Sequence, residues 1–546
     1  MVKRIPITNG NLSGHQFGAD DVLTGFSSST NVVFGDAGKN ILDHARGGND
    51  AINADGSFAT LALYGDAVGN IYDHGAGGND TLNANVSPVE PFSLVPVNLS
   101  MYGDVGGNMS GHANGGDDTL TASASNLPFN IRMFGDAGGD MSGHAAGGND
   151  LLLFVGKVPL EAHQPVAMYG DAGGNISGHG VAGNDILDLS QGFHHDGNYT
   201  LYGDAGRDIS GYTLGGDDIF KLKGLQNTAV IYGDAGSNMS GHAIAGNDTV
   251  INRSGQGDCT FYGDAGGSLS DHAHGGNDTF IAGNDGRLFF YGDAGGTLGD
   301  QAVGGDDTFS GAADFTALIY GDASTMSGNA HGGNDTLVIG QSGGSSLGVG
   351  DAQSISGDAQ GGNDLLTAAP PAFAQAHGTI MFVGDGQTMS GNAHGGCDVL
   401  SGLNVPASQP AGTFNSTLFG DAQTMTDNAC GGNDKLISGT GNDDMWGDAQ
   451  AMLGLARGGN DNFVFNSNNG HDKIEDFGQG LSNLGTDHVD VSALGIENVG
   501  ALNISAFDPT THETTITFSP GNDVVVHSEQ ALRPQDFIFA PHDLLI

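Results

Sequence analysis

Residues 262–280 have the sequence YGDAGGSLSDHAHGGNDTF, and near copies of this stretch recur along the chain, among them YGDVGGNMSGHANGGDDTL at 102–120. Fourteen full copies are present, each marked by a Gly-Asp pair, and successive pairs are 27 to 38 residues apart. A repeat of this length is typical of a solenoid, in which each coil covers the apolar face of its neighbour. The aspartates of the pairs are Asp36, Asp66, Asp104, Asp136, Asp171, Asp204, Asp234, Asp264, Asp293, Asp322, Asp351, Asp385, Asp421 and Asp448.

Each copy contains three strand-like pieces separated by glycine-rich turns. One precedes the Gly-Asp pair (LALYGD, NIRMFGD), a second is short (NMSGH, NILDH), and the third follows the second turn (NDTL, NDTF). Parallel stacking of such coils buries the recurring Tyr/Phe, Met/Ile and Leu/Phe positions in continuous columns. We therefore expect an all-β fold, an elongated parallel β-roll or β-helix solenoid of about fourteen coils with a C-terminal β cap.

The composition favours turns and bound cations. Of 63 acidic residues only six are Glu, Gly occurs 97 times, and the formal charge is −48 with 15 Lys and Arg. Asp and Gly suit turns and oxygen-rich cation sites. Nucleic acid and anionic membranes need basic surfaces, so we expect neither as a partner. An acidic, glycine-rich chain is also compatible with disorder, but the regularly placed apolar residues argue against it once cations are bound.

Targeting and redox signals are few. Cys259, Cys397 and Cys430 match neither a disulfide framework nor a zinc signature. The start MVKRIPITNGNLSG lacks the apolar core of a secretory signal, and no stretch is apolar enough for a transmembrane segment. Export, if it occurs, needs another route.

The second turn of each copy resembles the calcium-binding nonapeptide GGxGxDxUx of RTX proteins. Gly321–Val338 divides into GDASTMSGN and AHGGNDTLV, and SGTGNDDMW at Ser438–Trp446 is closer still. The resemblance covers residues 10–465, including a degenerate copy from Gly10. It implies multiple Ca²⁺ ions, each held by backbone carbonyls and by the Asp that closes the turn. The implied ligands are Asp50, Asp80, Asp118, Asp150, Asp185, Asp218, Asp248, Asp278, Asp307, Asp335, Asp364, Asp398, Asp434, Asp443 and Asp461.

Two features depart from the RTX pattern. The first turn carries Asn40, Asn70, Asn108, Asn175, Asn238 or Ser268 where a ligand Asp is expected, and only Asp140 and Asp208 keep the carboxylate. These turns either hold calcium weakly or stack as an Asn ladder without metal. We rank the aspartates of the Gly-Asp pairs second as ligands. The alternative to calcium is that the turn aspartates cap their turns through local hydrogen bonds. The repeats are also longer than two nonapeptides, about 18 residues, which favours a wider, three-sided coil with insertions at Asn83–Ser100 and Pro370–Thr379.

One repeat position carries histidine in most of the earlier copies: His15, His44, His74, His112, His144, His179, His242 and His272. At coil spacing these side chains form a column that could bind a transition metal or shuttle protons. From the tenth copy the residue is Asn329, Asp358, Asn392 or Asn428, which favours a structural ladder instead.

No catalytic residues can be assigned. His512-Glu513 does not continue as HExxH, and GQSGG at Gly340–Gly344 leads into the next coil rather than into the helix of a nucleophile elbow. An enzyme built on the solenoid edge, such as a polysaccharide lyase or epimerase, is the alternative function. Its candidate groups are Glu161 with His163 and His194 with His195 and Asp196.

The segment after Asp461 resembles the end of the β-roll in serralysin-type and other RTX exoproteins, with FVF at Phe463–Phe465, GHDKIEDF at Gly470–Phe477 and DHVDVSALG at Asp487–Gly495. TTITFSPGNDVVVH is typical of a hairpin and QDFIFAPHDLLI of a terminal strand. The resemblance implies a cap and an uncleaved signal for a type I ABC exporter, and so a secreted or cell-surface protein of a Gram-negative bacterium. We expect a degenerate N-terminal repeat or cap at 1–30, the solenoid at 31–465 and the cap with the secretion signal at 466–546.

The expected function is that of a calcium-loaded structural component of a surface layer, matrix or adhesive layer, with polysaccharide, the cell surface or further copies of itself as partners. Binding to ice or mineral is a third interpretation, which regular Thr and Asn after the second turn leave open.

Overall fold

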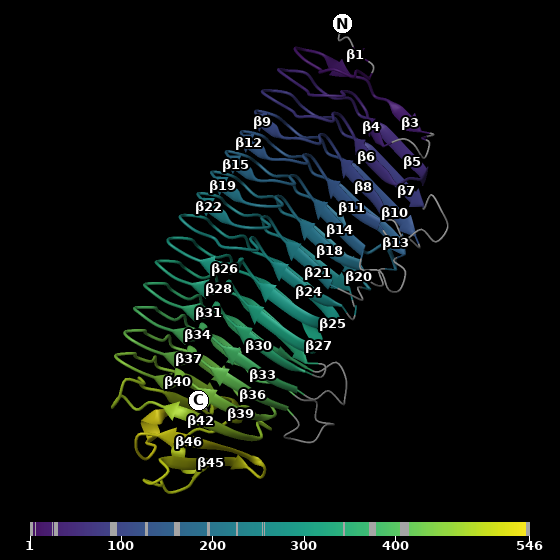
Figure 1. Cartoon of the computed structure of the whole chain (residues 1–546). Coiled ribbons are helices and arrows are strands. Elements are labelled where there is room, and N and C mark those ends of the chain that lie inside the picture. The colour runs from purple at the N-terminus through teal and green to yellow at the C-terminus, as the bar shows by residue number, and fades with distance from the viewer. Residues whose placement is uncertain are drawn as a thin grey trace, which may run out of the picture. The chain divides into compact units, whose positions relative to one another are not determined.

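The computed structural model describes residues 4–5, 7–24, 26, 31–87, 96–125, 129–157, 164–193, 197–224, 228–253, 255, 257–341, 344–370, 378–404 and 414–541. It is all-β, with parallel sheets stacked as a solenoid of about fourteen turns, as predicted (Figure 1). Helical structure in the described residues is limited to η1 (Ser492–Leu494), η2 (Val499–Ala501) and η3 (Pro534–Asp536). No helix in this part of the chain is long and apolar enough to cross a membrane. The chain divides into two compact units, Met1–Gly286 and Arg287–Ile546.

Coils of the first unit contain up to three strands, at the three predicted positions. Strands before the Gly-Asp pair are β4 (Val32–Phe34), β6 (Thr60–Tyr64), β8 (Val97–Tyr102), β11 (Phe129–Phe134), β14 (Gln164–Tyr169), β18 (Gly197–Tyr202), β21 (Thr228–Tyr232) and β24 (Asp258–Tyr262). The short strands are β9 (Met109–Gly111), β12 (Met141–Gly143), β15 (Ile176–Gly178), β19 (Ile209–Gly211) and β22 (Met239–Gly241). Strands after the second turn are β3 (Val22–Thr24), β5 (Ala51–Ser57), β7 (Thr81–Ser87), β10 (Thr119–Ser125), β13 (Leu151–Lys157), β16 (Ile186–Asp188), β20 (Ile219–Lys223), β23 (Thr249–Arg253) and the first residues of β25 (Thr279–Tyr291). The short strands β1 (Arg4–Ile5), β2 (Phe17–Gly18) and β17 (Gly192–Phe193) complete the unit.

The core of the first unit consists of columns of equivalent residues. Parallel pairing in register places each apolar residue on its counterpart in the next coil, because strands alternate buried and outward side chains. One such buried column is Ile52, Leu82, Leu120, Leu152, Leu187, Phe220, Val250 and Phe280. A second, half-buried column stacks the aromatic rings before the Gly-Asp pairs, from Tyr64 to Tyr262, with centroids 4.6–5.3 Å apart.

The second unit repeats the arrangement. Strands before the Gly-Asp pair are the end of β27 (Thr308–Tyr320), β30 (Ser345–Val349), β33 (Gly378–Val383), β36 (Phe414–Phe419) and β39 (Asn442–Trp446). β42 (His471–Phe477) pairs with β39 and continues this set, although no Gly-Asp pair follows it. A parallel six-stranded sheet contains β26 (Ala294–Leu298), β28 (Ala323–Met326), β31 (Ala352–Ile355), β34 (Gly386–Met389), β37 (Ala422–Met425) and β40 (Ala449–Met452). The third set contains the start of β27, β29 (Thr336–Gln341), β32 (Leu365–Ala369), β35 (Val399–Ser401), β38 (Lys435–Ile437), β41 (Asn462–Val464), β43 (His488–Asp490) and β47 (Phe537–Ile538).

The C-terminal segment continues the parallel sheets. β46 (Asn522–Ser528) pairs in parallel with β42 and in antiparallel with β45 (Glu513–Ser519), which also pairs with β44 (Asn503–Ile504). The predicted hairpin is therefore confirmed, and β47 forms in the predicted terminal strand. That this segment caps the solenoid and signals secretion stays a prediction, and residues 542–546 lie outside the described residues.

Phe220→Ala removes the ring of a fully buried side chain from the apolar column of the first unit. We expect it to lower the free energy of unfolding by about 3–5 kcal/mol, because the stacked coils cannot close the cavity. Urea unfolding in calcium, followed by circular dichroism, measures the loss. Ile281→Ala, at a side chain that is 47% exposed, is the matched control and should change stability by less than about 1 kcal/mol. Equal effects of the two substitutions would contradict the assigned core.

Candidate metal centre

Two columns of aspartates lie inside the coils. The first contains the Asp that closes the second turn, for example Asp50 and Asp80, and the second contains the Asp of the Gly-Asp pair, for example Asp36 and Asp66. All fifteen predicted ligand aspartates are at most 2% exposed. The aspartates of the fourteen Gly-Asp pairs are fully buried. The two columns therefore form one acidic interior, and the Gly-Asp aspartates that the sequence ranked second are as deeply buried as the others.

The second-turn aspartates form a hydrogen-bonded ladder. The backbone N–H of Asp50 donates to Oδ1 of Asp80 at 2.5 Å, and that of Asp80 donates to Oδ1 of Asp118 at 2.6 Å. The same bond recurs at 2.6–2.7 Å down to Asp278, and in the second unit from Asp307 to Asp461 at 2.6–2.8 Å. Only one oxygen of each carboxylate is used in this ladder.

The other oxygen is buried without a hydrogen-bond partner in most of these aspartates. This holds for Oδ2 of Asp50, Asp80, Asp118, Asp150, Asp185, Asp218, Asp248, Asp335, Asp364, Asp398, Asp434 and Asp461. None of these carboxylates forms an ion pair with a lysine, arginine or histidine of the described residues. A buried acceptor left unpaired costs about 1–3 kcal/mol, and more if charged. The unpaired oxygen recurs at the same atom from coil to coil and is therefore a feature of the repeat rather than an isolated defect.

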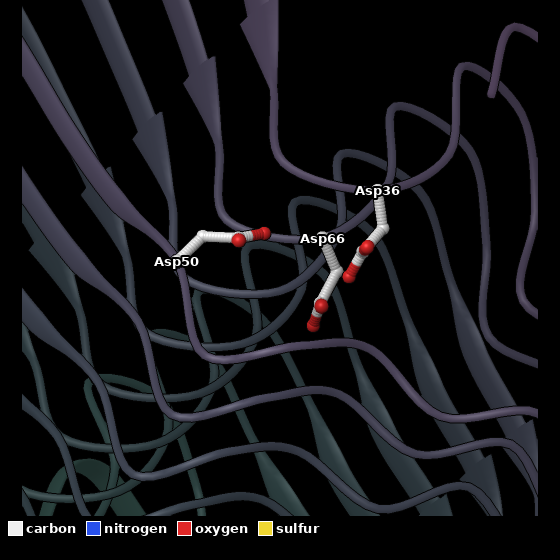
Figure 2. Close-up of side chains that lie close together, drawn as sticks. All are labelled: Asp36, Asp50 and Asp66. Carbon is white, nitrogen blue, oxygen red and sulfur yellow. The ribbon is translucent and has the colours of Figure 1, made fainter. Parts of the chain in front are cut away.

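The Gly-Asp aspartates complete the clusters. Oδ2 of Asp66 accepts the backbone N–H of Gly78 at 2.8 Å, while Oδ1 of Asp66 has no hydrogen-bond partner. Figure 2 shows the carboxylate of Asp50 directed toward those of Asp36 and Asp66. In this group, and in the group of Asp66, Asp80 and Asp104, ligand oxygens lie within 4.8 Å of one another. Each group takes two aspartates from one coil and one from the next.

Backbone carbonyls line the same space, and glycine makes room for them. A Cβ placed on Gly35 would lie 1.7 Å from Oδ2 of Asp50 and 2.0 Å from the carbonyl oxygen of Gly65. On Gly65 it would meet the carbonyl oxygen of Gly103 at 1.8 Å. Carboxylates and carbonyls are the hard oxygen donors that Ca²⁺ prefers. The residues present therefore fit a divalent cation with oxygen ligands.

Burial shifts the acidity of these groups. Desolvation raises the pKa of Asp50 from 3.8 to about 8. The pKa of Asp80 is also raised well above its usual value, first by burial and then by the carboxylates of Asp66 and Asp118. Two negative charges about 5 Å apart repel by roughly 3 kcal/mol at an effective dielectric constant of about 20. Several such pairs exceed the 5–15 kcal/mol that stabilises a typical domain, so the column must be protonated or neutralised by cations.

Exposed positions of the same turns behave differently. The residue that directly precedes each second-turn aspartate is exposed. In coil order, starting from the degenerate first copy, these residues are Asp20, Asn49, Asn79, Asp117, Asn149, Asn184, Asp217, Asn247 and Asn277. No two Asp are neighbours here, and the side chains form a ladder in which the N–H of Asn247 donates to Oδ1 of Asp217 at 2.8 Å. At this exposed position adjacent carboxylates are absent, although Asp43 and Asp73 are exposed neighbours elsewhere on the coils, whereas in the buried column adjacent carboxylates occur at every coil. This contrast favours a cation-binding role for the buried aspartates over simple turn capping.

Asp443 is the one predicted ligand outside the column. It lies in β39, before a Gly-Asp pair, where its Oδ1 accepts the N–H of Ser416 and its Oδ2 that of Gly439. Both of its oxygens are therefore satisfied.

The sequence analysis did not predict Asp487 as a member of the column. This residue is 1% exposed and continues the ladder by accepting the N–H of Asp461 at 2.9 Å. In the sequence, the signal for the second column was that every full copy of the repeat keeps the Asp of its Gly-Asp pair.

The side chains of the first turn form a hydrogen-bonded Asn ladder, and the predicted choice between weak calcium binding and a metal-free ladder stays a prediction. The N–H of Asn70 donates to Oδ1 of Asn40 at 2.9 Å, and that of Asn108 to Oδ1 of Asn70 at 2.7 Å. Asp140 takes the same place, since its Oδ1 accepts both the backbone N–H and the side-chain amide of Asn175.

The predicted histidine column is present in the first unit, with ring centroids 4.8–5.2 Å apart from His15 to His272. Tyr212, which the sequence analysis did not include, stands between His179 and His242. In the second unit Asn392 donates to Asp358 and Asn428 to Asn392. Within the described chain no three histidines bring ligand atoms within 4.8 Å of one another. Stacking and amide hydrogen bonds therefore support the structural ladder.

The enzyme candidates receive no support from the described residues. GQSGG begins in β29 and the next described element is the strand β30, whereas a nucleophile elbow leads from a strand into a helix; residues 342–343 lie outside the described residues. Glu161, His163, His194, His195 and Asp196 lie outside the described residues, as do parts of both predicted insertions, 88–95 and 371–377.

Asp218→Asn separates cation binding from turn capping by the sign of its effect. The Asn side chain keeps the oxygen that accepts the N–H of Asp185 but removes the charge. In calcium we expect the variant to need about tenfold more calcium to fold, because a carboxylate ligand is lost. Without divalent cations we expect it to be more stable than the wild type, because burial raises the pKa of Asp218 and so disfavours its ionised form.

Asp217→Asn is the matched control for this test. Asp217 is the exposed neighbour in the same turn, and the amide oxygen of its replacement can still accept the N–H of Asn247. We expect a change of less than about 0.5 kcal/mol in both conditions. Thermal unfolding at several calcium concentrations measures both variants. A stabilising or neutral effect of Asp218→Asn in calcium would support turn capping instead.

The raised pKa of Asp50, about 8 against 3.8, fixes the direction of the pH dependence. In the metal-free protein the folded chain keeps protons that the unfolded chain releases between these values, so the free energy of unfolding falls as pH rises from about 4 to 8. In calcium the ion competes with protons, so apparent calcium affinity rises over the same range. Circular dichroism and calcium titration at pH 5, 6.5 and 8 check both trends. Metal-free stability that is constant or rises over this range would refute the assignment.

No family model, curated protein or solved structure matches the chain. An inference about function therefore depends on the chemistry of the buried carboxylates themselves.

Proposed function

We propose that the chain is a calcium-binding, RTX-like solenoid whose buried aspartates hold multiple Ca²⁺ ions between successive coils. The observation that carries the proposal is the recurrence, coil after coil, of a buried carboxylate oxygen without a hydrogen-bond partner. Asp36, Asp50 and Asp66 are one such set of ligands, and Asp66, Asp80 and Asp104 are the next. Bound calcium supplies the positive charge that these groups lack.

The donor set favours calcium over other metals. The clusters contain carboxylate and carbonyl oxygens, whereas zinc, copper and nickel sites in proteins usually include imidazole or thiolate ligands. Mg²⁺ has the same preference for oxygen, but it keeps several waters and needs a nearly ideal octahedron. A buried, irregular group of protein oxygens suits the larger and less demanding ion.

Coupling between calcium and folding supports a secreted protein. The metal-free repeats carry a large negative charge, −48 over the chain, which opposes compaction. Extracellular calcium modules bind with dissociation constants of about 10⁻⁴–10⁻³ M, so sites of this kind stay empty at cytosolic calcium levels. The chain would cross a type I exporter unfolded and fold outside, where binding free energy becomes folding free energy. The proposed role is structural, in a surface layer, matrix or adhesive layer.

Calcium titration of the full chain tests the proposal. Starting from protein freed of divalent cations at pH 7.5, we expect circular dichroism to change from disordered to β-rich and the scattering radius of gyration to fall, cooperatively, between about 0.1 and 1 mM calcium. Chelation should reverse both changes, and magnesium, zinc and nickel at equal concentration should not replace calcium. A chain that is compact and β-rich after complete removal of divalent cations would overturn the proposal.

A further inference from the structure

A cluster of cationic side chains lies on the first unit of this acidic chain. Lys221, Lys223 and Arg253, three of only 15 Lys and Arg, line a single surface cleft of about 430 Å³. Asp188, Ser190 and Gln191 also line the cleft. The cleft lies on the outer face of the strands that follow the second turn, away from the buried aspartates.

The strand register places the cations together. In β20 the side chains of Phe220 and Leu222 are buried, so those of Lys221 and Lys223 point outward on the same face. Lys223 pairs directly with Arg253 of β23 in the next coil. Coils are about 4.8 Å apart, so two positive charges stand on neighbouring strands.

This arrangement costs stability and is not required by the fold. Like charges directly opposite each other on paired strands are destabilising. The column of Lys221 contains, in the preceding coils, Asn53, Asn83, Thr121, Leu153 and Asp188, so Asp188 stands directly opposite Lys221. Within the described residues none of the three cations forms an ion pair, and Oδ1 of Asp188 accepts the N–H of Ser190 at 2.7 Å. Asp188 offsets part of the charge of Lys221, whereas Lys223 and Arg253 remain paired like charges without an ion-pair partner in the described residues.

The same outer face carries a hollow of about 270 Å³ a few coils away. It is lined by the polar side chains of Asn53, Asn83, Asn85, Thr121 and Ser123, by Ala54 and Ala84, and by the carboxylate of Asp55. The amide of Asn83 donates to Asn53, and that of Asn85 to Asp55, both at 3.0 Å. The strands β10, β13, β16 and β20 pair in sequence, so three coil steps, roughly 14 Å, separate Thr121 from Lys221. Amides and hydroxyls at this distance suit the hydroxyl groups of an extended sugar chain.

We propose that this outer face of the first unit binds an acidic oligosaccharide, with Lys221, Lys223 and Arg253 holding its carboxylate or sulfate groups and the amide-lined hollow contacting its hydroxyls. Lysine and arginine form charge-assisted hydrogen bonds to such anions. A nucleic acid fits less well, because none of the described residues that line the cleft is aromatic and base stacking is a main source of single-strand affinity. The inference goes beyond calcium binding and needs calcium only to keep the coils folded.

The test uses the full chain in 5 mM calcium, with circular dichroism confirming that every variant is folded. Isothermal titration calorimetry with a hexagalacturonate, a sulfated hexasaccharide and the neutral cellohexaose compares ligands of similar length. We expect either or both acidic ligands to bind and cellohexaose not to bind. The two acidic ligands distinguish a carboxylate from a sulfate source of the anion.

The decisive variant is the triple substitution Lys221→Gln, Lys223→Gln and Arg253→Gln, which should weaken acidic-ligand binding by at least about tenfold, or 1.4 kcal/mol. The matched control, Lys39→Gln with Arg207→Gln, removes exposed cations elsewhere on the same unit and should keep the wild-type affinity. Wild-type affinity in the triple variant would overturn the proposal and indicate calcium bridges between the glycan and surface aspartates. Equal binding of cellohexaose, or tighter binding of an oligothymidylate of equal charge, would also overturn it. A chain that stays folded without calcium would overturn the calcium proposal alone.

Discussion

Repulsion between buried carboxylates is the constraint on which this fold depends. Coil spacing places each Asp within about 5 Å of its counterpart, and burial raises the pKa of Asp50 to about 8. Each charged neighbour adds roughly 3 kcal/mol of repulsion. Repeated along a column, this repulsion cannot be offset by the burial of the apolar columns alone. The same residues cannot be moved outward, because their Oδ1 atoms accept the backbone N–H groups that hold one coil to the next. The ladder therefore fixes the carboxylates where only protons or cations make them tolerable.

Glycine and asparagine are distributed according to this constraint. Gly35 and Gly65 stand where a Cβ would fill the space between carboxylate and carbonyl oxygens. On the exposed side of the turn, Asn149 and Asn184 separate Asp117 from Asp217, so the outer ladder keeps its hydrogen bonds without stacking charges. One turn thus presents to water a hydrogen-bonded ladder without adjacent carboxylates, and to the interior a ladder of carboxylates only. The histidine column is a third ladder, held by ring stacking, in which Tyr212 stacks in the place of an imidazole between His179 and His242.

The sequence was sufficient to predict the solenoid, its three strand positions and most of the acidic column, because each follows from a local pattern that recurs in register. It misplaced Asp443, since a GND tripeptide occurs both at the second turn and in β39, and only strand pairing distinguishes the two corners. It undervalued Asp66 and its equivalents, because a single repeat does not show that the Gly-Asp pair of the next coil completes the cluster. The cationic cleft depends on register between strands whose intervening loops differ in length, which local patterns do not reveal.

Sharing of Asp66 between two clusters has a consequence for how such a chain folds. Its carboxylate belongs both to the group with Asp36 and Asp50 and to the group with Asp80 and Asp104. A single coil therefore lacks a complete ligand set, and the smallest competent unit is a pair of stacked coils. Each further coil adds one carboxylate that completes a cluster of which its predecessor already holds two, so the cost of ordering is highest for the first pair. With the proposed calcium ions in these clusters, calcium affinity and coil stacking are one equilibrium, coupled from neighbour to neighbour, and the steepness of the proposed calcium transition reflects how many coils fold together.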